Sequence, residues 1–201
     1  MTRGRLIVFE GGEASGKSTQ ARLLAAELGA VLTREPGGTA VGKRVRDVVL
    51  DPDVAELSAR AEALLMAADR AQHVAEVVEP ALARGDDVVS DRFAPSSLAY
   101  QGFGRGLDLD ELRRLSAWAT AGVEPDLVVL LDVPPEVGRA RRGSRPDRME
   151  AEDDAFHRRV AEGYRQLAAA DADRWVIIDG TADVETVWAR VREAVGAVLS
   201  K

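Results

Sequence analysis

Residues 11–18 match the phosphate-loop pattern G-x-x-x-x-G-K-[ST] in full: Gly11-Gly12-Glu13-Ala14-Ser15-Gly16-Lys17-Ser18. The apolar run 6–9 precedes them and an amphipathic segment begins near Lys17, so the pattern lies where a strand is expected to turn into a helix. Gly11 and Gly16 allow backbone angles that let successive N–H groups curl around a phosphate, and the helix adds its positive dipole end. The stretch predicts a bound nucleoside triphosphate, with Lys17 on the β- and γ-phosphates and Ser18 on Mg²⁺.

Length and composition narrow the classes of protein that fit. The 201 residues suit one domain with a hydrophobic core, and the absence of cysteine excludes disulfides and thiolate metal sites. His73 and His157 are too far apart to suggest a zinc site, and we expect them to be surface or hydrogen-bonded residues rather than catalysts. No run approaches the roughly 18 apolar residues of a membrane span, and the first strand begins too early for a signal peptide. We therefore expect a cytoplasmic enzyme with no membrane partner.

Charge gives a second restriction. The formal net charge of −7 argues against a broad nucleic-acid-binding face. Only Lys17, Lys43 and Lys201 are lysines, so nearly all of the 27 basic residues are arginine. The planar guanidinium suits bidentate phosphate contacts. Local arginine clusters are therefore expected to hold a small anionic substrate despite the negative total.

Short apolar runs alternate with longer helical patterns along the chain. This alternation predicts βαβ units and an α/β fold with a parallel sheet of about five strands and helices on both faces. Strands are expected at 6–10, 30–33, 87–90, 127–133 and 175–178. Helices are expected at 17–28, 40–50, 55–84, 94–102, 108–121, 134–142, 153–170 and 183–199. No repeat or linker divides the sequence, so residues 1–201 are expected to form a single domain.

The segment 55–84 is apolar around more than one face. That pattern is typical of a core helix and also of a subunit interface, and the sequence leaves both open. Pro80 is expected to bend or interrupt this helix.

Polar residues follow three predicted strands and are expected at the carboxyl edge of the sheet, where doubly wound folds bind ligands. Arg34 and Glu35 follow the second strand, where they would be exposed and could orient a substrate. Asp91 and Arg92 follow the third, with Asp91 as a Mg²⁺ ligand, direct or through water, and Arg92 as a clamp for a second phosphate. A surface ion pair is the alternative for these two, and Asp132 competes with Asp91 for the metal.

The segment 139–148 holds five arginines around a Gly-Ser-Arg-Pro turn that breaks the helix. Such a run is commonly a solvated face. In a phosphate-binding chain it also suits a lid that closes over the triphosphate, excludes water and offsets developing charge. We favour the lid and place it at about residues 139–150.

Several further motifs belong together. They are Arg34-Glu35-Pro36-Gly37-Gly38-Thr39, Ala68-Asp69-Arg70-Ala71-Gln72-His73, Ser90-Asp91-Arg92-Phe93, Ser96-Ser97-Leu98-Ala99-Tyr100-Gln101-Gly102, Pro125-Asp126-Leu127 through Asp132-Val133, and Asp147-Arg148-Met149-Glu150. With the phosphate loop, they resemble the bacterial thymidylate kinases from Leu6 to about Asp179. The resemblance implies a P-loop nucleoside monophosphate kinase fold and a homodimer. It also implies transfer of the ATP γ-phosphate to dTMP with Mg²⁺, giving dTDP and ADP, a step of dTTP synthesis.

The resemblance also implies roles for single residues. ATP would contact Gly11, Gly12, Glu13, Ala14, Ser15, Gly16, Lys17, Ser18 and Thr19. The acceptor nucleotide would contact Glu13, Arg34, Met66, Arg70, Arg92, Ser97, Tyr100 and Gln101. Glu13 looks like the acidic residue near the deoxyribose and Arg92 like the clamp on the acceptor phosphate. Arg70 and Ser97 look like readers of the thymine edge, and Tyr100 like the ring that disfavours ribonucleotides.

Two positions depart from the family pattern. Met66 stands where phenylalanine often stacks on thymine, so weaker pyrimidine discrimination is expected, because a methionine side chain is less rigid. Ala14 stands where some members place an arginine in the loop, while here the lid is rich in arginine. This predicts that Arg141 or Arg145 stabilises the transition state, beside Lys17 and the phosphate clamp.

The residues alone leave other classes open. A different nucleoside or nucleoside monophosphate kinase shares this architecture and differs in its acceptor. An ATP-binding regulatory module would not release ADP in response to dTMP. A GTPase-like switch with an Asn-Lys-x-Asp motif is impossible, because the chain contains no asparagine. A dinucleotide-binding fold is disfavoured, because no Gly-x-Gly-x-x-Gly follows the first strand.

Overall fold

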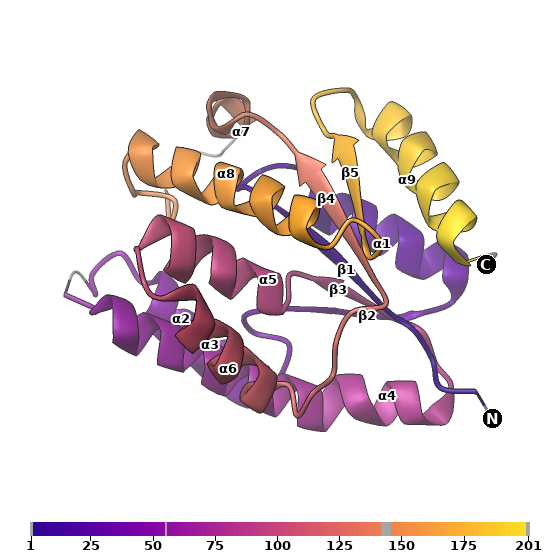
Figure 1. The fold of residues 1–201 in the computed structure, drawn as a ribbon, viewed down its shortest axis with the longest axis horizontal. Helices are drawn as coiled ribbons and strands as arrows, with labels where there is room; N and C mark the ends of the chain where they lie inside the picture. The colour runs from indigo at the N-terminus through magenta and orange to yellow at the C-terminus, as the bar shows by residue number, and fades with distance from the viewer. Residues whose placement is uncertain (1, 55, 142–145, 200–201) are drawn as a thin grey trace.

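A parallel sheet is the centre of the computed structural model, which describes residues 2–54, 56–141 and 146–199. Its strands are β1 (Leu6–Gly11), β2 (Val31–Arg34), β3 (Val88–Asp91), β4 (Leu127–Asp132) and β5 (Trp175–Asp179). They lie in the order β2-β3-β1-β4-β5, and each neighbouring pair is parallel (Figure 1). Every expected strand is confirmed, with ends shifted by at most one residue.

Helices connect the strands. They are α1 (Lys17–Leu28), α2 (Ala40–Leu50), α3 (Ala59–His73), α4 (Glu79–Arg84), α5 (Ala94–Ser97), α6 (Leu109–Ala119), α7 (Pro135–Arg141), α8 (Asp154–Ala170) and α9 (Val184–Leu199), with the π-helical segments η1 (Val74–Val78) and η2 (Leu98–Gly104). The helices expected at 17–28 and 40–50 match α1 and α2. Within the described ranges, no helix combines the length and apolarity needed to cross a bilayer.

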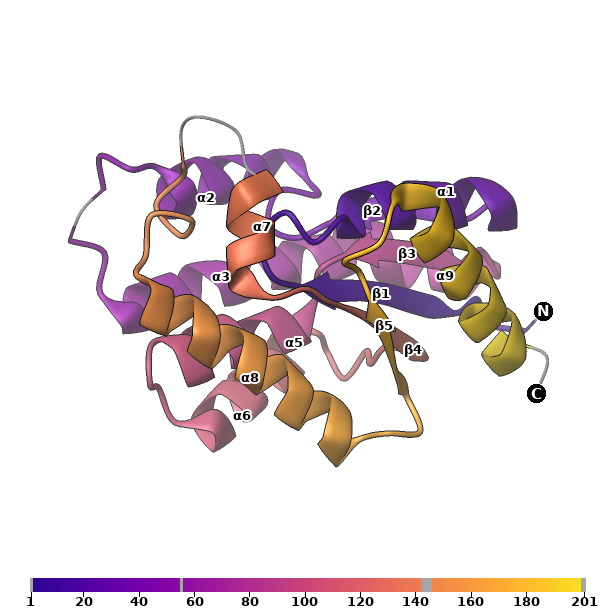
Figure 2. The same cartoon turned by 90° about the horizontal axis from the view of Figure 1, so that it is seen from above.

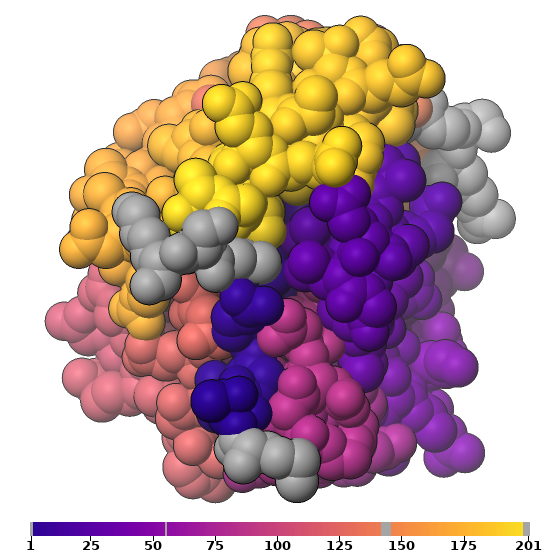
Figure 3. Space-filling view, turned by 90° about the vertical axis from the view of Figure 1, so that its right-hand side faces the viewer, coloured from indigo at the N-terminus to yellow at the C-terminus, as the bar shows by residue number. Residues whose placement is uncertain are grey.

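The two faces of the sheet are covered by different helices (Figures 1 and 2). Successive strand residues point to opposite faces. Ile7 and Phe9 therefore join the core under α1 and α9, while Leu6 and Val8 pack against η1 and α4. On the side shown in Figure 3, the yellow C-terminal segment lies against the indigo-to-purple segment that includes α1, in agreement with the contacts between α1 and α9. The expectation of helices on both faces is confirmed.

The segment expected as one helix over 55–84 begins at Ala59, after Ser58, whose side chain accepts a hydrogen bond from the Ala61 N–H. It then runs through α3, η1 and α4 without leaving helical backbone angles. Pro80 lies two residues after the end of the π-helical segment, in the first turn of α4, where a missing N–H matters least. The helix is therefore widened just before the proline and is not broken by it.

The parallel arrangement brings the carboxyl ends of all five strands to one edge. Phe9 of β1 pairs with Asp91 of β3, and Asp91 pairs with Arg34 of β2. The phosphate loop after β1 and the polar residues after β3 are therefore neighbours, at the edge where open α/β sheets bind ligands.

Candidate active site

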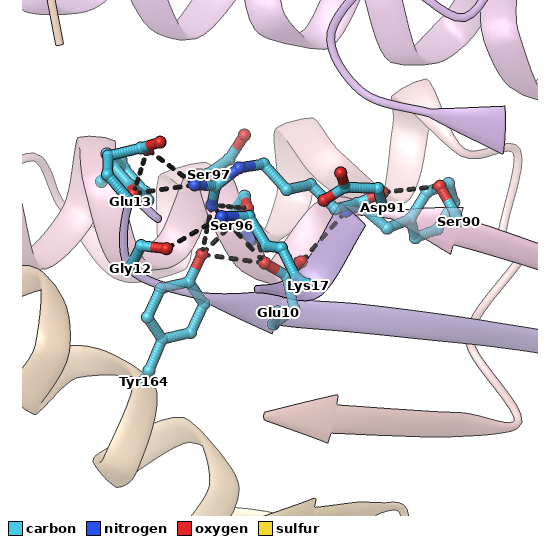
Figure 4. A network of polar contacts seen from close by, with 12 residues as sticks. Glu10, Gly12, Glu13, Lys17, Ser90, Asp91, Ser96, Ser97 and Tyr164 are labelled. Atoms are coloured by element: carbon cyan, nitrogen blue, oxygen red, sulfur yellow. Dashed lines mark hydrogen bonds and ion pairs between the residues drawn. The ribbon is translucent and has the colours of Figure 1, made fainter. Parts of the chain in front are cut away.

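The phosphate loop leads from β1 into α1 with the backbone that the motif predicts. Gly11 has a φ of 146° and Gly16 a φ of 93°, both in the region that favours glycine. A Cβ at Gly11 would also lie 2.6 Å from the Leu131 carbonyl oxygen. Lys17 is buried and its Nζ donates to the Gly12 carbonyl at 2.8 Å, as Figure 4 shows. The loop is therefore closed around its own lysine at the N-terminus of α1.

Ser18 and Asp91 meet between α1 and β3. The Ser18 hydroxyl donates to Asp91 Oδ2, while Asp91 Oδ1 is buried and has no hydrogen-bond partner among the described residues. A buried unpaired carboxylate oxygen is costly unless a further ligand satisfies it. One carboxylate beside a hydroxyl fits Mg²⁺, which binds few protein groups and takes its other ligands from phosphates and water. The competing Asp132 instead accepts two hydrogen bonds from Arg165, at 2.9 and 3.0 Å.

The backbone after β3 holds Arg92 in an unusual conformation. Its φ of 72° is left-handed, which costs on the order of 1–2 kcal/mol for a residue with a side chain. The Ser90 hydroxyl donates to the Arg92 carbonyl at 2.7 Å. Glu10, fully buried on β1, accepts the N–H groups of Phe93 and Ser96 at 3.0 and 3.2 Å. These contacts hold the backbone turn after β3 in place and thereby orient the Arg92 side chain.

The Arg92 guanidinium is held by four side chains from three parts of the chain. Nη2 donates to Glu13 at 2.6 Å and to the Tyr100 hydroxyl at 3.0 Å. Nη1 donates to Ser96 at 3.1 Å and to the Tyr164 hydroxyl at 3.0 Å. Figure 4 shows Tyr164 rising from α8 toward this cluster. A partly buried cation held in this way is preorganised to receive an anion.

Glu13 connects the phosphate loop to this cluster. Burial opposes its ionisation, but the charges of Arg92 and Lys17 and the Tyr100 hydroxyl outweigh that effect and lower the pKa of Glu13 to about 2. Helix α7 packs closely on the same residue, because a Cβ at Gly138 would lie 2.5 Å from the Glu13 carbonyl oxygen. The backbone of Glu13 thus belongs to the loop, and its carboxylate faces the neighbouring space.

That space is a hollow beside the phosphate loop, lined by both apolar and charged side chains. Four of its lining residues are among those predicted to contact an acceptor: Glu13, Met66, Arg92 and Tyr100. The sequence analysis missed others, including Pro36, Arg46, Leu50, Asp147 and Met149. The hollow has apolar lining residues, with an arginine and a glutamate at one end. Such a lining suits a nucleotide, because the faces of its base are apolar and its phosphate is charged.

Arg70 and Ser97 lie behind the wall of the hollow. Arg70 is only 2% exposed, and its Nη2 donates to the Ser97 hydroxyl at 3.1 Å and to the Phe93 carbonyl at 3.2 Å. Its Nε donates to Glu35 at 2.8 Å. The expectation that Glu35 is exposed is wrong, because this carboxylate is buried between Arg70 and His73. His73 is itself buried and hydrogen-bonded, as expected.

Two predicted acceptor residues lie elsewhere. Arg34 is exposed at the end of β2. Gln101 is buried and donates to Glu62 at 2.8 Å, so its amide nitrogen is directed into a different cluster. Glu62 also accepts from Arg105 at 3.0 Å and from Arg148 at 2.6 Å. Gln101 therefore supports a buried ion network rather than the lining of the hollow.

The arginine-rich segment is only partly described. Arg141 donates to the carbonyl oxygens of Gly180 at 2.9 Å and Thr181 at 2.8 Å, on the loop between β5 and α9. Arg145 lies outside the described residues. The proposed catalytic roles of these two arginines stay predictions.

Three buried residues that support the site or the neighbouring ion network also had no role in the sequence analysis. Glu10 carried a signal, because a glutamate that directly follows an apolar strand run needs buried partners. Burial raises the pKa of Glu10, which accepts hydrogen bonds from Ser96 and Tyr164. Tyr164 and Glu62 carried no comparable signal, since each sits within an ordinary helical pattern.

Comparison with known proteins agrees with this geometry. The family model described as thymidylate kinase matches residues 9–191. The thymidylate kinase of Deinococcus radiodurans is 50% identical over 204 residues, covering 96% of this chain and 98% of the relative. That of Synechococcus sp. is 51% identical over 190 residues, covering 92% of this chain and 91% of the relative. The crystal structure of thymidylate kinase from Ehrlichia chaffeensis matches with a TM-score of 0.79 and 30% identity, over 96% of this chain and 99% of that one.

Proposed function

Because the chain belongs to the thymidylate kinase family and is an enzyme that phosphorylates dTMP, we propose that transfer occurs at the carboxyl ends of β1 and β3. ATP binds on the phosphate loop and dTMP in the adjoining hollow. The observation that carries this proposal is the 2.6 Å contact between Glu13 of the loop and Arg92 of the hollow. This contact supports the proposal, because transfer requires the two bound phosphates to lie side by side.

On the donor side, the loop N–H groups and the dipole of α1 receive the triphosphate. Lys17 exchanges the Gly12 carbonyl for the β- and γ-phosphates. The chemistry is in-line displacement, in which an acceptor phosphate oxygen bonds to the γ-phosphorus and the bond to the β–γ bridging oxygen breaks. Lys17 and Arg92 stabilise the charge on the transferred group, and a lid arginine, Arg141 or Arg145, adds to this.

We assign Ser18 and Asp91 as the residues that would hold Mg²⁺. The buried oxygen of Asp91 that lacks a described partner supports this assignment. Held by these two residues, Mg²⁺ would supply positive charge that offsets the charge of the phosphates. The D91N enzyme should need far more Mg²⁺ for half-maximal activity, whereas D132N should resemble the wild type. A greater Mg²⁺ requirement in D132N than in D91N would instead assign the metal site to Asp132.

On the acceptor side, Arg92 clamps the dTMP phosphate, with Glu13 and Tyr100 beside the sugar. Met66 covers a face of the base. Arg70 and Ser97, which lie next to the hollow, hydrogen-bond to the edge of the base. The position of Met66, Arg92 and Tyr100 around one hollow supports this orientation. Contacts of Arg34 and Gln101 with the acceptor stay predictions.

The test of this placement is Arg92→Lys, which keeps the charge and removes the fork. KM for dTMP should rise at least about tenfold while KM for ATP changes little, because the loss of one charge-assisted hydrogen bond is worth 1.5–3 kcal/mol. R84K, on the exposed side of α4, is the control. ADP release is measured with dTMP, dUMP and thymidine as acceptors. An unchanged KM for dTMP in R92K, or turnover of thymidine, would refute the placement.

We also propose a homodimer formed through α3 and α6. These helices pack on each other, and they expose Leu64 of α3 by 59% and Trp118 of α6 by 82%. Exposed large apolar side chains of this kind mark interaction surfaces. Light scattering should give a dimer mass for the wild type and a monomer mass for L64R/W118R, while I177R on β5 stays dimeric. A monomeric wild type would refute the proposal. The expected cytoplasmic location stays a prediction.

A further inference from the structure

Five residues behind the wall of the hollow form one hydrogen-bonded line, which we call the His73 chain. Thr33 Oγ1 lies 2.6 Å from His73 Nε2, and His73 Nδ1 lies 2.8 Å from Glu35 Oε1. Glu35 Oε2 accepts from Arg70 Nε at 2.8 Å, and Arg70 Nη2 donates to Ser97 Oγ at 3.1 Å. The line connects β2, α3 and α5, and its members from His73 to Ser97 are buried.

The chemistry of the partners fixes the protons along this line. Glu35 faces a guanidinium on one oxygen and an imidazole on the other, so it acts as an acceptor on both sides. His73 Nδ1 therefore carries a proton and donates it to Glu35, while Nε2 lies at hydrogen-bond distance from the Thr33 hydroxyl. The ring packs directly against Gly38, where a Cβ would lie 2.7 Å from its Cδ2 atom. The Nδ1 side of the ring thus faces Glu35.

The line runs beside residues that line the acceptor hollow. Met66 precedes Arg70 by one helical turn on α3, and Pro36 follows Glu35 in sequence; both line the hollow. Arg70 uses Nε and Nη2 for the contacts with Glu35, Ser97 and the backbone, and its Nη1 donates to none of the residues that the structure describes. That nitrogen is the donor left for a ligand, and its direction depends on how the other two are held.

We propose that His73 is a positioning residue for recognition of the acceptor base. Through Glu35 it fixes the plane of Arg70, and so sets the affinity for the pyrimidine monophosphate without touching it. Without the hydrogen bond from His73, the Glu35 carboxylate would be held by Arg70 alone and could rotate about its own side-chain bonds. The Arg70 guanidinium would then rotate with it. The inference rests on the proposed function, since it takes Arg70 to face the base of dTMP.

Two substitutions separate positioning from packing. His73→Asn places an amide N–H near the position of Nδ1 and keeps the donor to Glu35, whereas His73→Gln extends its amide toward Nε2 and abandons Glu35. We expect H73Q to raise KM for dTMP about tenfold and to lower the preference for dTMP over dUMP, with kcat and KM for ATP within about twofold. H73N should stay within about threefold of the wild type. Q72A, on the adjacent residue that bonds outward to Glu76, is the control.

A folded H73Q enzyme with an unchanged KM for dTMP, or with KM for ATP raised as much, overturns the inference. If H73Q does not fold, ¹⁵N NMR of the wild-type rings decides, because the chain has only two histidines and an H157Q spectrum assigns them. A proton on Nδ1 of His73 supports the chain, and a proton on Nε2 alone overturns it. The R70A variant separates the proposed acceptor site from the role of His73. An unchanged KM for dTMP in R70A refutes the proposed acceptor site. A raised KM for dTMP in R70A together with an unchanged KM in H73Q refutes only the role of His73.

Discussion

The buried ion network around Glu62 gives a sharp prediction for stability. Glu62 is 0% exposed and accepts hydrogen bonds from Gln101, Arg105 and Arg148 at 2.8, 3.0 and 2.6 Å. Burial opposes its ionisation, but the hydrogen bonds from these three side chains outweigh it and lower the pKa of Glu62. In Glu62→Gln the shape is kept, the charge is lost, and an amide N–H₂ group faces guanidinium donors.

The expected loss follows from what the two arginines retain. Removing one partner of a buried ion pair costs about 3–5 kcal/mol. Arg105 keeps Glu152 at 2.5 Å and the Phe156 ring at 4.7 Å from its Cζ, and Arg148 keeps the Val49 carbonyl at 2.7 Å. The cost therefore falls at the lower end, about 3 kcal/mol. For a chain of this size, about 2–4 °C accompanies each kcal/mol, so Tm should fall by about 6–12 °C.

Scanning calorimetry of E62Q and E152Q provides the assay. Glu152 binds the same Arg105 from the partly exposed side, so E152Q should lose no more than about 1 kcal/mol. Met149 follows Arg148 and lines the hollow, so E62Q should also raise KM for dTMP. A Tm for E62Q within about 2 °C of the wild type, or no lower than that of E152Q, would refute the reasoning.

Three further results are expected. Glu13 has its pKa at about 2 instead of 4.5, so its ionised form adds stability above pH 4.5, at most about 3 kcal/mol, that is lost as the pH falls toward 2. Urea unfolding of E13Q should therefore depend less steeply on pH over that interval, and an equally steep curve contradicts this. Met66→Phe should raise the ratio of dTMP to dUMP turnover, because a rigid ring covers the base better; an unchanged ratio counts against it. The double variant R141A/R145A should lose about 100-fold or more in kcat with little change in either KM, and a nearly intact kcat removes both arginines from catalysis.

The strands were predictable from the sequence because their signals are local. The apolar runs 6–9 and 127–131 mark β1 and β4, and all expected strands are found with ends shifted by at most one residue. The π-helical segments were not predictable in this way. In η1, Val74 and Val78 are buried against β1 and β3, and no local pattern encodes such long-range packing.

The residues of the candidate site also fall into those with a local sequence signal and those placed only by the fold. The phosphate loop is contiguous in the chain, so its glycines and Lys17 were identified from spacing alone. Tyr164 reaches Glu10 across 154 positions of sequence, and a tyrosine in a helical pattern gives no sign of that partner. The burial of Glu35 was missed for a related reason: a turn motif suggests exposure, and only the fold brings Arg70 and His73 against it.

In the function proposed above, Glu13 belongs to both nucleotide sites, because its backbone lies in the phosphate loop under α7 and its carboxylate contacts Arg92. An inhibitor that joins a donor mimic to an acceptor mimic would therefore meet this one residue at the junction of its two parts. A substitution there that weakens such a compound also releases Arg92 and disturbs the loop. We expect resistance to such an inhibitor to arise at other residues that line the hollow, such as Leu50 or Met149, and not at the point where the two sites join.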